Sequence, residues 1–377
     1  MSRFTLYPFR TVLALITLLF SYLLFWPVVV EPKVWSAPKA PEYVEQYSVN
    51  HDLAEFEALS LAGQLGPEGV AVSEQYVYAA TEAGWVVRWA RKALSDGNLE
   101  GQLWVNTQGR PLGLALGPGG DLWIADAFRG ILRVDAAGVV FPVVEAFDGK
   151  PLLYTNDLTF AANGRLYFTD STTRFSAKAY GSTYKASLID LMEHGDTGRV
   201  FELDPSSGKL RQLFGGLSFA NGIAADPQGR FILVNETAEY RVWKYWLVGE
   251  KAGRAEVLVD NLPGFPDNLY VGKATSNGDI RYWLGFTSPR LPLVDLIADK
   301  PMVRKVVQRL PSFVRPKAKH YGHVLAISEE GAIVENLQDP NAAYPLTTGV
   351  AETANHLYIS SLVAPVLARI DKRPLGL

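Results

Sequence analysis

The chain contains no cysteine among its 377 residues. Disulfide bridges, thiolate metal sites and a cysteine nucleophile are therefore excluded. The chain also has no large excess of positive or negative charge, because its formal net charge is only −3. A balance of this kind gives no reason to expect a nucleic acid as a partner. The sequence offers instead many short apolar segments that are separated by glycine and asparagine.

Six of these segments repeat one local pattern. Each begins with a polar or turn residue, continues as a short apolar strand and is followed by a second strand rich in aromatic and β-branched residues. Blocks of four short strands that recur every ~40–50 residues are typical of a β-propeller. The six segments are residues 68–72, 112–116, 156–160, 221–225, 267–271 and 348–352.

The spacing of the repeats supports this interpretation. Gly69 and Gly113 are 44 residues apart, and the two longer intervals contain insertions at about residues 171–198 and 287–322. We therefore predict an all-β, six-bladed propeller over residues 51–377. The last blade has room for three strands, so we expect residues 53–59 to supply its fourth strand and to close the ring without an exposed edge.

The N-terminal region is of a different kind. Residues 11–30 carry no charge, and twenty residues are long enough to cross a bilayer as a helix. Arg3 and Arg10 precede this run, which favours an N-in orientation. We predict a cytoplasmic stub (1–10), an uncleaved transmembrane signal-anchor (11–30), a proline-containing linker (31–50) and a propeller in the periplasm, the exterior or a lumen. A cleaved signal peptide is the alternative.

The direction of the strands places both insertions at one rim of the channel, where we expect them to act as lids. Residues 291–320 combine apolar with basic residues and predict a basic amphipathic helix, or two helices broken at Pro301 and Pro311. One alternative is that its apolar side packs on the propeller. The other is that the lid also rests on an anionic membrane surface.

The residue before each first strand should lie at this same rim. Two carboxylates and two amide oxygens suit a hard cation such as Ca²⁺, and the absence of histidine and cysteine from the ring argues against Zn²⁺ or copper. The alternative is that asparagine and aspartate are ordinary turn residues before strands. The six rim residues are Glu68, Leu112, Asn156, Asn221, Asp267 and Thr348.

Several motifs resemble the strictosidine synthase-like proteins, in particular the adipocyte plasma membrane-associated protein branch. They include Gly-Pro-Glu-Gly at 66–69, Thr-Asn-Asp-Leu at 155–158 and, most specifically, Leu-Pro-Gly-Phe-Pro-Asp-Asn at 262–268. The resemblance implies kinship with paraoxonases, gluconolactonases and diisopropyl fluorophosphatase, which are six-bladed propellers with calcium in the channel. By position it implies that calcium is bound by Glu68, Asn156, Asn221 and Asp267, with Asn268 as a further ligand.

The chain also departs from these relatives. Leu112 stands where paraoxonases place a histidine proposed as base, so an imidazole-assisted mechanism is not implied. Thr348 stands where strictosidine synthase keeps its catalytic glutamate, with Glu352 four residues further on, which argues against strictosidine synthesis. A second, structural calcium is not expected, because Gly69 offers no ligand although Asp157 is present.

A calcium ion in the channel would polarise an ester, lactone or phosphoryl oxygen as a Lewis acid. The base would then come from the rim, either from Asp267 or from Asp126, Asp170 and Glu236 at the ends of second strands. For these last three carboxylates the alternative is capping of turns.

Two functions remain open at this point. The first is a membrane-anchored, calcium-dependent hydrolase of small hydrophobic lactones or aryl esters. The second is a calcium-stabilised propeller without enzymatic activity that binds a hydrophobic ligand or a protein partner. A strictosidine synthase-type lyase is less favoured than either.

Overall fold

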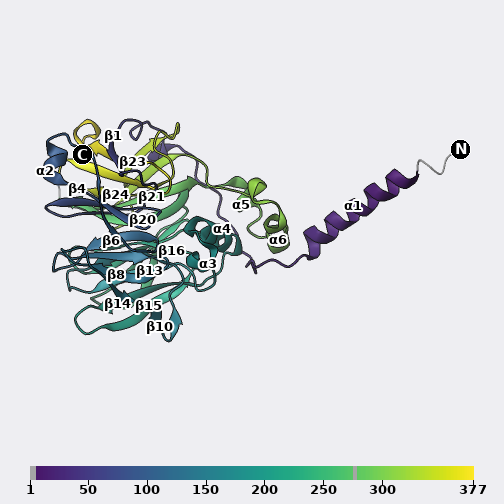
Figure 1. Cartoon of the computed structure of the whole chain (residues 1–377), viewed down its shortest axis with the longest axis horizontal. Helices are drawn as coiled ribbons and strands as arrows, with labels where there is room; N and C mark the ends of the chain where they lie inside the picture. The colour runs from purple at the N-terminus through teal and green to yellow at the C-terminus, as the bar shows by residue number, and fades with distance from the viewer. Residues whose placement is uncertain (1–5, 275–277) are drawn as a thin grey trace.

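Six four-stranded antiparallel sheets follow one another along the chain in a computed structural model that describes residues 6–274 and 278–377 (Figure 1). The six-bladed all-β propeller is thereby confirmed. The first three blades contain β2 (Val70–Val72), β3 (Tyr76–Ala80), β4 (Trp85–Ala90), β5 (Gln102–Asn106); β6 (Pro111–Leu116), β7 (Leu122–Asp126), β8 (Gly130–Val134), β9 (Val140–Val144); and β12 (Thr155–Phe160), β13 (Leu166–Asp170), β14 (Gly198–Asp204), β15 (Lys209–Leu217).

Blades four and five are built in the same order, from the innermost strand outward. They contain β16 (Ala220–Ala225), β17 (Phe231–Glu236), β18 (Arg241–Trp246), β19 (Ala255–Val259); and β20 (Gly264–Ala274), β21 (Ile280–Pro289), β22 (Gly322–Ile327), β23 (Ile333–Asp339). Outside the blades lie the short pair β10 (Ala146–Phe147) and β11 (Lys150–Pro151), the helix α2 (Arg91–Ser95) and the 3₁₀ turns η1 (Glu45–Tyr47) and η3 (Arg373–Leu375).

Blade six joins the two ends of the propeller. Its strands β24 (Thr347–Glu352), β25 (His356–Ser361) and β26 (Val366–Asp371) are completed by β1 (Glu57–Ser60), which pairs antiparallel with β26. The predicted N-terminal closing strand is therefore present, although it begins at Glu57. Leu59 lies opposite Leu367, and both side chains are fully buried, so closure also fills the core between blades six and one.

The innermost strands of adjacent blades approach one another so closely that the residue after the rim residue, such as Gly69, has little room for a side chain. A Cβ atom on Gly69 would lie 1.8 Å from the carbonyl oxygen of Leu112 in the next blade. Glycine removes this clash and lets adjacent inner strands meet around the channel. Between the blades, the buried side chains form clusters that each draw on two neighbouring sheets, as expected when every unit packs only on its neighbours.

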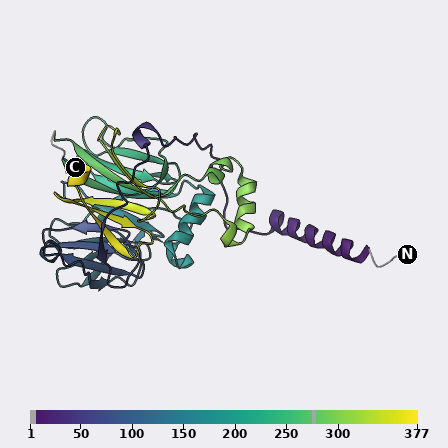
Figure 2. The same ribbon diagram turned by 90° about the horizontal axis from the view of Figure 1, so that it is seen from above.

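Both insertions are helical and connect the second strand of a blade to its third. The first contains α3 (Ala177–Tyr180) and α4 (Thr183–Glu193), and the second contains α5 (Pro292–Leu296), α6 (Pro301–Arg309) and the 3₁₀ turn η2 (Ser312–Val314). The second insertion is broken near the two expected prolines, since α6 begins at Pro301 and ends before Pro311. The labelled helices α4, α5 and α6 lie on the side of the propeller from which α1 projects (Figures 1 and 2).

The N-terminal helix α1 (Leu6–Phe25) ends five residues earlier than the predicted span of 11–30. Pro27 explains this difference, because the residue before a proline disfavours the helical conformation and proline itself has no amide hydrogen. Within the part of the chain that the structure describes, no helix meets the length and apolarity required to cross a membrane. Of the expected cytoplasmic stub 1–10, residues 1–5 lie outside the described residues.

Residues 31–50, the predicted proline-containing linker, are in contact with the propeller. The side chain of Val30 is fully buried against the propeller, and the amide of Lys33 donates to the carbonyl of Glu193 at 3.0 Å. Further on, the carbonyl of Lys39 accepts a hydrogen bond from Asn261 at 3.0 Å, and Tyr47 is buried in the core. We call residues 30–50 the N-terminal strap, because this segment is bound along its length to the propeller.

Candidate functional site

The predicted ring residues lie at an irregularity that recurs in the inner strands. In five blades the pairing between the innermost strand and the second strand shifts by one residue at the same place. Two residues of the innermost strand there lie opposite one residue of the second strand. Such bulges redirect side chains and are common next to functional sites. The shifted pairs begin with Leu112, Asn156, Asn221, Asp267 and Thr348.

Among the described residues, three asparagines around the channel have a hydrogen-bonded side-chain nitrogen and a side-chain oxygen without a partner. Their amide nitrogens are held by the protein, from Asn156 to Ser171 Oγ at 2.9 Å, from Asn221 to Thr237 Oγ1 at 3.0 Å, and from Asn268 to the carbonyl of Glu68 at 2.7 Å. Their side-chain oxygens are buried and lack a hydrogen-bond partner among the described residues. A buried amide oxygen without a hydrogen-bond partner lowers the stability of a fold. Three of them around one channel therefore suggest a binding site for a cation.

Two buried carboxylates complete the ring. Burial raises the pKa of Asp267 well above its usual range, and the charge of Glu68 raises it further, whereas a hydrogen bond from Asn221 opposes the shift. Burial also raises the pKa of Glu68, against the opposing charge of Arg110. Two acids of this kind repel each other and favour a bound cation or a bound proton.

Arg110 forms an ion pair with Glu68 in this ring. Its guanidinium is buried, with a side-chain exposure of 5%, and also donates to the carbonyl of Pro111 at 3.1 Å. The sequence analysis missed this residue, although the motif Gly-Arg-Pro-Leu-Gly at 109–113 contains it. An arginine in a loop is usually exposed, so only the fold reveals that this one faces a carboxylate at the channel.

The donors present fit a calcium ion. Across residues 6–274 and 278–377 there is no cluster of three or more histidine, cysteine, aspartate and glutamate side chains placed to hold a metal. The ring differs from such a cluster because its oxygens come largely from amides, which calcium accepts readily. Asn156, Asn221, Asn268, Asp267 and Glu68 would hold the ion, with Glu68 partly engaged by Arg110.

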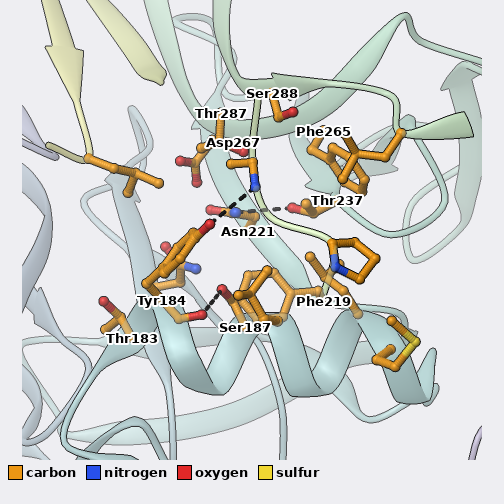
Figure 3. Close-up of a pocket in the computed structure, with 18 of the residues that line it drawn as sticks. Thr183, Tyr184, Ser187, Phe219, Asn221, Thr237, Phe265, Asp267, Thr287 and Ser288 are labelled. Atoms are coloured by element: carbon orange, nitrogen blue, oxygen red, sulfur yellow. Dashed lines mark hydrogen bonds between the residues drawn. The ribbon is translucent and has the colours of Figure 1, made fainter. Parts of the chain in front are cut away.

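A cavity with about 870 Å³ of empty space, part of it open to solvent, joins the ring to both insertions. Glu68, Asn156, Asn221 and Asp267 form its polar floor. Figure 3 shows Asn221, Asp267 and Thr237 on one side and the α4 residues Tyr184 and Ser187 on the other. Its apolar walls come from the loops and insertions and include Leu188, Leu191, Met192, Phe219, Phe265, Leu291 and Val294.

The three second-strand carboxylates lie elsewhere. Asp126 accepts from the amide of Arg110 at 2.9 Å, Asp170 from the amide of Tyr154 at 2.9 Å, and Glu236 from the amide of Ser218 at 2.6 Å. Among the described residues that line the cavity, none of the three appears. This geometry supports their alternative role, which is to brace the loop that leads into each first strand.

Two further positions agree with the departures noted in the sequence. Leu112 is fully buried in an apolar cluster with Val30, Tyr154 and Phe219, and it is not among the described residues that line the cavity. Thr348 donates to the carbonyl of Glu68 at 2.8 Å. Glu352, the other acid considered for this blade, is paired with Lys372 and Arg281.

Tyr154 is a second residue that the sequence analysis missed. It lines the cavity, and burial together with the charges of Glu68 and Asp267 raises the pKa of its phenol well above the usual range. Like an unperturbed tyrosine, it is protonated at neutral pH, and its hydroxyl can donate a hydrogen bond. Its place two residues before Asn156 is the sequence signal that would have found it.

Comparison with known proteins gives the relationship. The strictosidine synthase family model matches residues 156–250, and the N-terminal model of strictosidine synthase-like proteins matches residues 46–89. The adipocyte plasma membrane-associated protein of Bos taurus is 30% identical over 364 residues, which cover 90% of this chain and 84% of that protein. The chain belongs to the strictosidine synthase-like family.

Solved structures share the fold of this family member. A gluconolactonase from Xanthomonas campestris superposes with a TM-score of 0.58 at 17% identity, covering 91% of this chain and 98% of that one. The calcium-binding protein regucalcin from Agrobacterium tumefaciens gives a TM-score of 0.53 at 15% identity, covering 83% and 95%. At these identities the likeness establishes the propeller alone.

Proposed function

We propose that this protein is a calcium-dependent hydrolase of small hydrophobic lactones or aryl esters. The observation that carries the proposal is the set of unpartnered amide oxygens beside Asp267 and Glu68, at the floor of a cavity with apolar walls. When bound there, calcium would act as a Lewis acid toward the carbonyl oxygen of the substrate. The fold shared with a gluconolactonase and with regucalcin is consistent with this chemistry.

Other residues of the cavity would contact the substrate, accept a proton and donate a hydrogen bond. Phe219, Phe265 and Leu291 contact the apolar part of the substrate and exclude water from it. Asp267 both holds the ion and is the acid best placed to accept a proton from water, since Leu112 lies outside the cavity. Tyr154 lines the cavity with a phenol that would donate a hydrogen bond to developing negative charge.

The test is hydrolysis of a panel of lactones and aryl esters by the purified full chain, with and without a calcium chelator. We expect slow, calcium-dependent turnover, because loss of an acid–base partner typically costs ~10²–10⁴ in rate. Asp267→Asn is expected to abolish it and Tyr154→Phe to lower kcat with little effect on calcium binding. Hydrolysis that survives both chelation and Asp267→Asn would place the chemistry elsewhere.

A second candidate function is a calcium-stabilised propeller that binds a hydrophobic ligand without chemistry. Leu112 in place of a histidine and the occupation of Glu68 by Arg110 favour it. Calcium binding without turnover on the whole panel would select this function.

We also propose that the protein is held at a membrane, N-in, with the propeller outside the cytoplasm. Support comes from α1, which carries large apolar side chains exposed to solvent, and from the second insertion, where Leu296, Met302 and Phe313 are exposed at 66%, 60% and 76%. The two are joined, because Arg309 donates to the carbonyls of Trp26 at 2.6 Å and Leu23 at 2.9 Å. Lys317 and Lys319, which are exposed in the same insertion, suit an anionic lipid surface.

Protease protection in sealed vesicles tests the orientation, since a propeller outside the cytoplasm is digested from that side only. Flotation with vesicles that contain anionic lipid tests the insertion. Phe313→Glu is expected to weaken association, whereas Val139→Glu, at an exposed apolar residue of the propeller, is expected to leave it unchanged.

A further inference from the structure

The pairing of Arg110 with Glu68 changes the charge of the candidate calcium ring. Glu68 and Asp267 would offer two negative charges to a bound cation, and the ion pair of Glu68 with the buried guanidinium of Arg110 offsets one of them. Calcium sites are tuned by the number of charged ligands that they offer. An arginine inside the ring therefore acts against the ion that the oxygens favour.

Arg110 is held in this place by its surroundings. Its backbone amide donates to Asp126 at 2.9 Å, and its guanidinium donates to the carbonyl of Pro111 at 3.1 Å as well as to Glu68. The side chains of Arg110 and Glu68 each have an exposure of 5%. A buried pair of this kind is costly to open, because either partner alone would keep a charge away from water.

We propose that Arg110 and calcium compete for Glu68, so that Arg110 sets the affinity of the ring for the ion. This inference rests on the calcium ring of the proposed function and adds the residue that regulates it. When calcium is absent, Arg110 neutralises Glu68 and stabilises the fold. When calcium binds, Glu68 is shared with the ion and part of the pair's stabilisation is lost, which weakens binding.

The test is a calcium titration by calorimetry of the full chain and of three variants. Arg110→Met removes the charge and keeps an apolar stem, and we expect it to bind calcium about tenfold more tightly or better. Arg110→Lys keeps a charge and is expected to resemble the wild type. Arg281→Met is the matched control, because it breaks a buried pair with Glu352, at the opposite end of β24 from the rim residue Thr348, and is expected to leave calcium affinity unchanged.

Thermal unfolding supplies a second readout. Without calcium, Arg110→Met is expected to unfold at a lower temperature than the wild type, and saturating calcium is expected to close this difference. Arg281→Met should be less stable than the wild type at every calcium concentration. If Arg110→Met does not fold, Arg110→Gln, which retains donors for Glu68 and Pro111, replaces it in both measurements.

An affinity of Arg110→Met within about twofold of the wild type, or weaker, overturns the competition, as does a failure of both proteins to bind calcium. These outcomes are separable from those of the proposed function. Tight calcium binding by Arg110→Met without hydrolysis leaves the competition standing and removes the hydrolase. Calcium-dependent hydrolysis, together with a calcium affinity that Arg110→Met leaves unchanged, supports the hydrolase and overturns the competition.

Discussion

Trp35 stacks on His194 with ring centroids 4.3 Å apart and an interplanar angle of 19°. The contact joins the N-terminal strap to His194, the C-cap of α4. Residues of α4 line the candidate cavity. The indole nitrogen of Trp35 donates to Glu239 at 2.9 Å, and the same carboxylate is within 2.8 Å of His194. The strap, the first insertion and blade four are thus bound together beside the site.

Replacing Trp35 with alanine is expected to lower the free energy of unfolding by about 2 kcal/mol, because a stacked aromatic ring and a hydrogen bond are lost together. Urea unfolding of the full chain measures the effect. Trp26→Ala is the control, since that side chain is 61% exposed and its loss is expected to cost less than about 0.5 kcal/mol. Equal effects of the two changes would mean that the strap does not stabilise the propeller.

Asp267→Asn is expected to abolish the rise in melting temperature that calcium produces. For the wild type, calcium at 100 times its Kd should add about 2.7 kcal/mol of stability, because the ion binds the native state. Glu68→Gln should also weaken the effect, and Glu82→Gln, at an exposed neighbouring acid, should not. A wild-type protein that contains and binds no calcium contradicts the site.

Asp190 on α4 predicts a dependence of stability on pH. Burial raises its pKa to about 7, and the nearby charge of Glu193 adds to the shift against a hydrogen bond from Thr172. The folded chain therefore binds this proton more tightly than the unfolded chain, and stability falls as pH rises toward and through 7.

Asp190→Asn removes this loss. The variant should gain stability relative to the wild type between pH 4 and pH 8, by up to about 4 kcal/mol. Urea unfolding without calcium at pH 4, 6 and 8 measures the change. Asp148→Asn, at an exposed turn, should show no such trend. A constant difference between Asp190→Asn and the wild type at all three pH values would show that Asp190 titrates normally.

Leu112→His is expected to destabilise the protein by about 1–3 kcal/mol without raising hydrolysis, because the imidazole would enter the apolar cluster of Val30, Tyr154 and Phe219. Leu112→Met preserves volume and should cost less than about 1.5 kcal/mol. Urea unfolding and the ester panel check both. Faster hydrolysis with unchanged stability would mean that the new imidazole reaches the cavity.

Much of the fold was predictable because the repeats reflect local geometry. An apolar strand after a polar residue, repeated six times with a spacing near 44 residues except where the two insertions lengthen it, determines the six blades and the place of the rim. The missing strand of the last blade predicted closure by the N-terminal segment, since a sheet edge left open is unfavourable. The amide and carboxylate residues of the ring followed from the same register.

Tertiary structure alone decided what those side chains meet. Asn156, Asn221 and Asp267 lie at bulges and line the cavity, and no local pattern in the sequence specifies a bulge. Arg110 meets Glu68 across 42 residues, a contact that spacing does not encode. Asp126 instead accepts a backbone amide, and the strap is bound along the propeller. The sequence by itself thus determined the blades and the oxygen-bearing residues of the rim, whereas long-range packing decided their partners and charge balance.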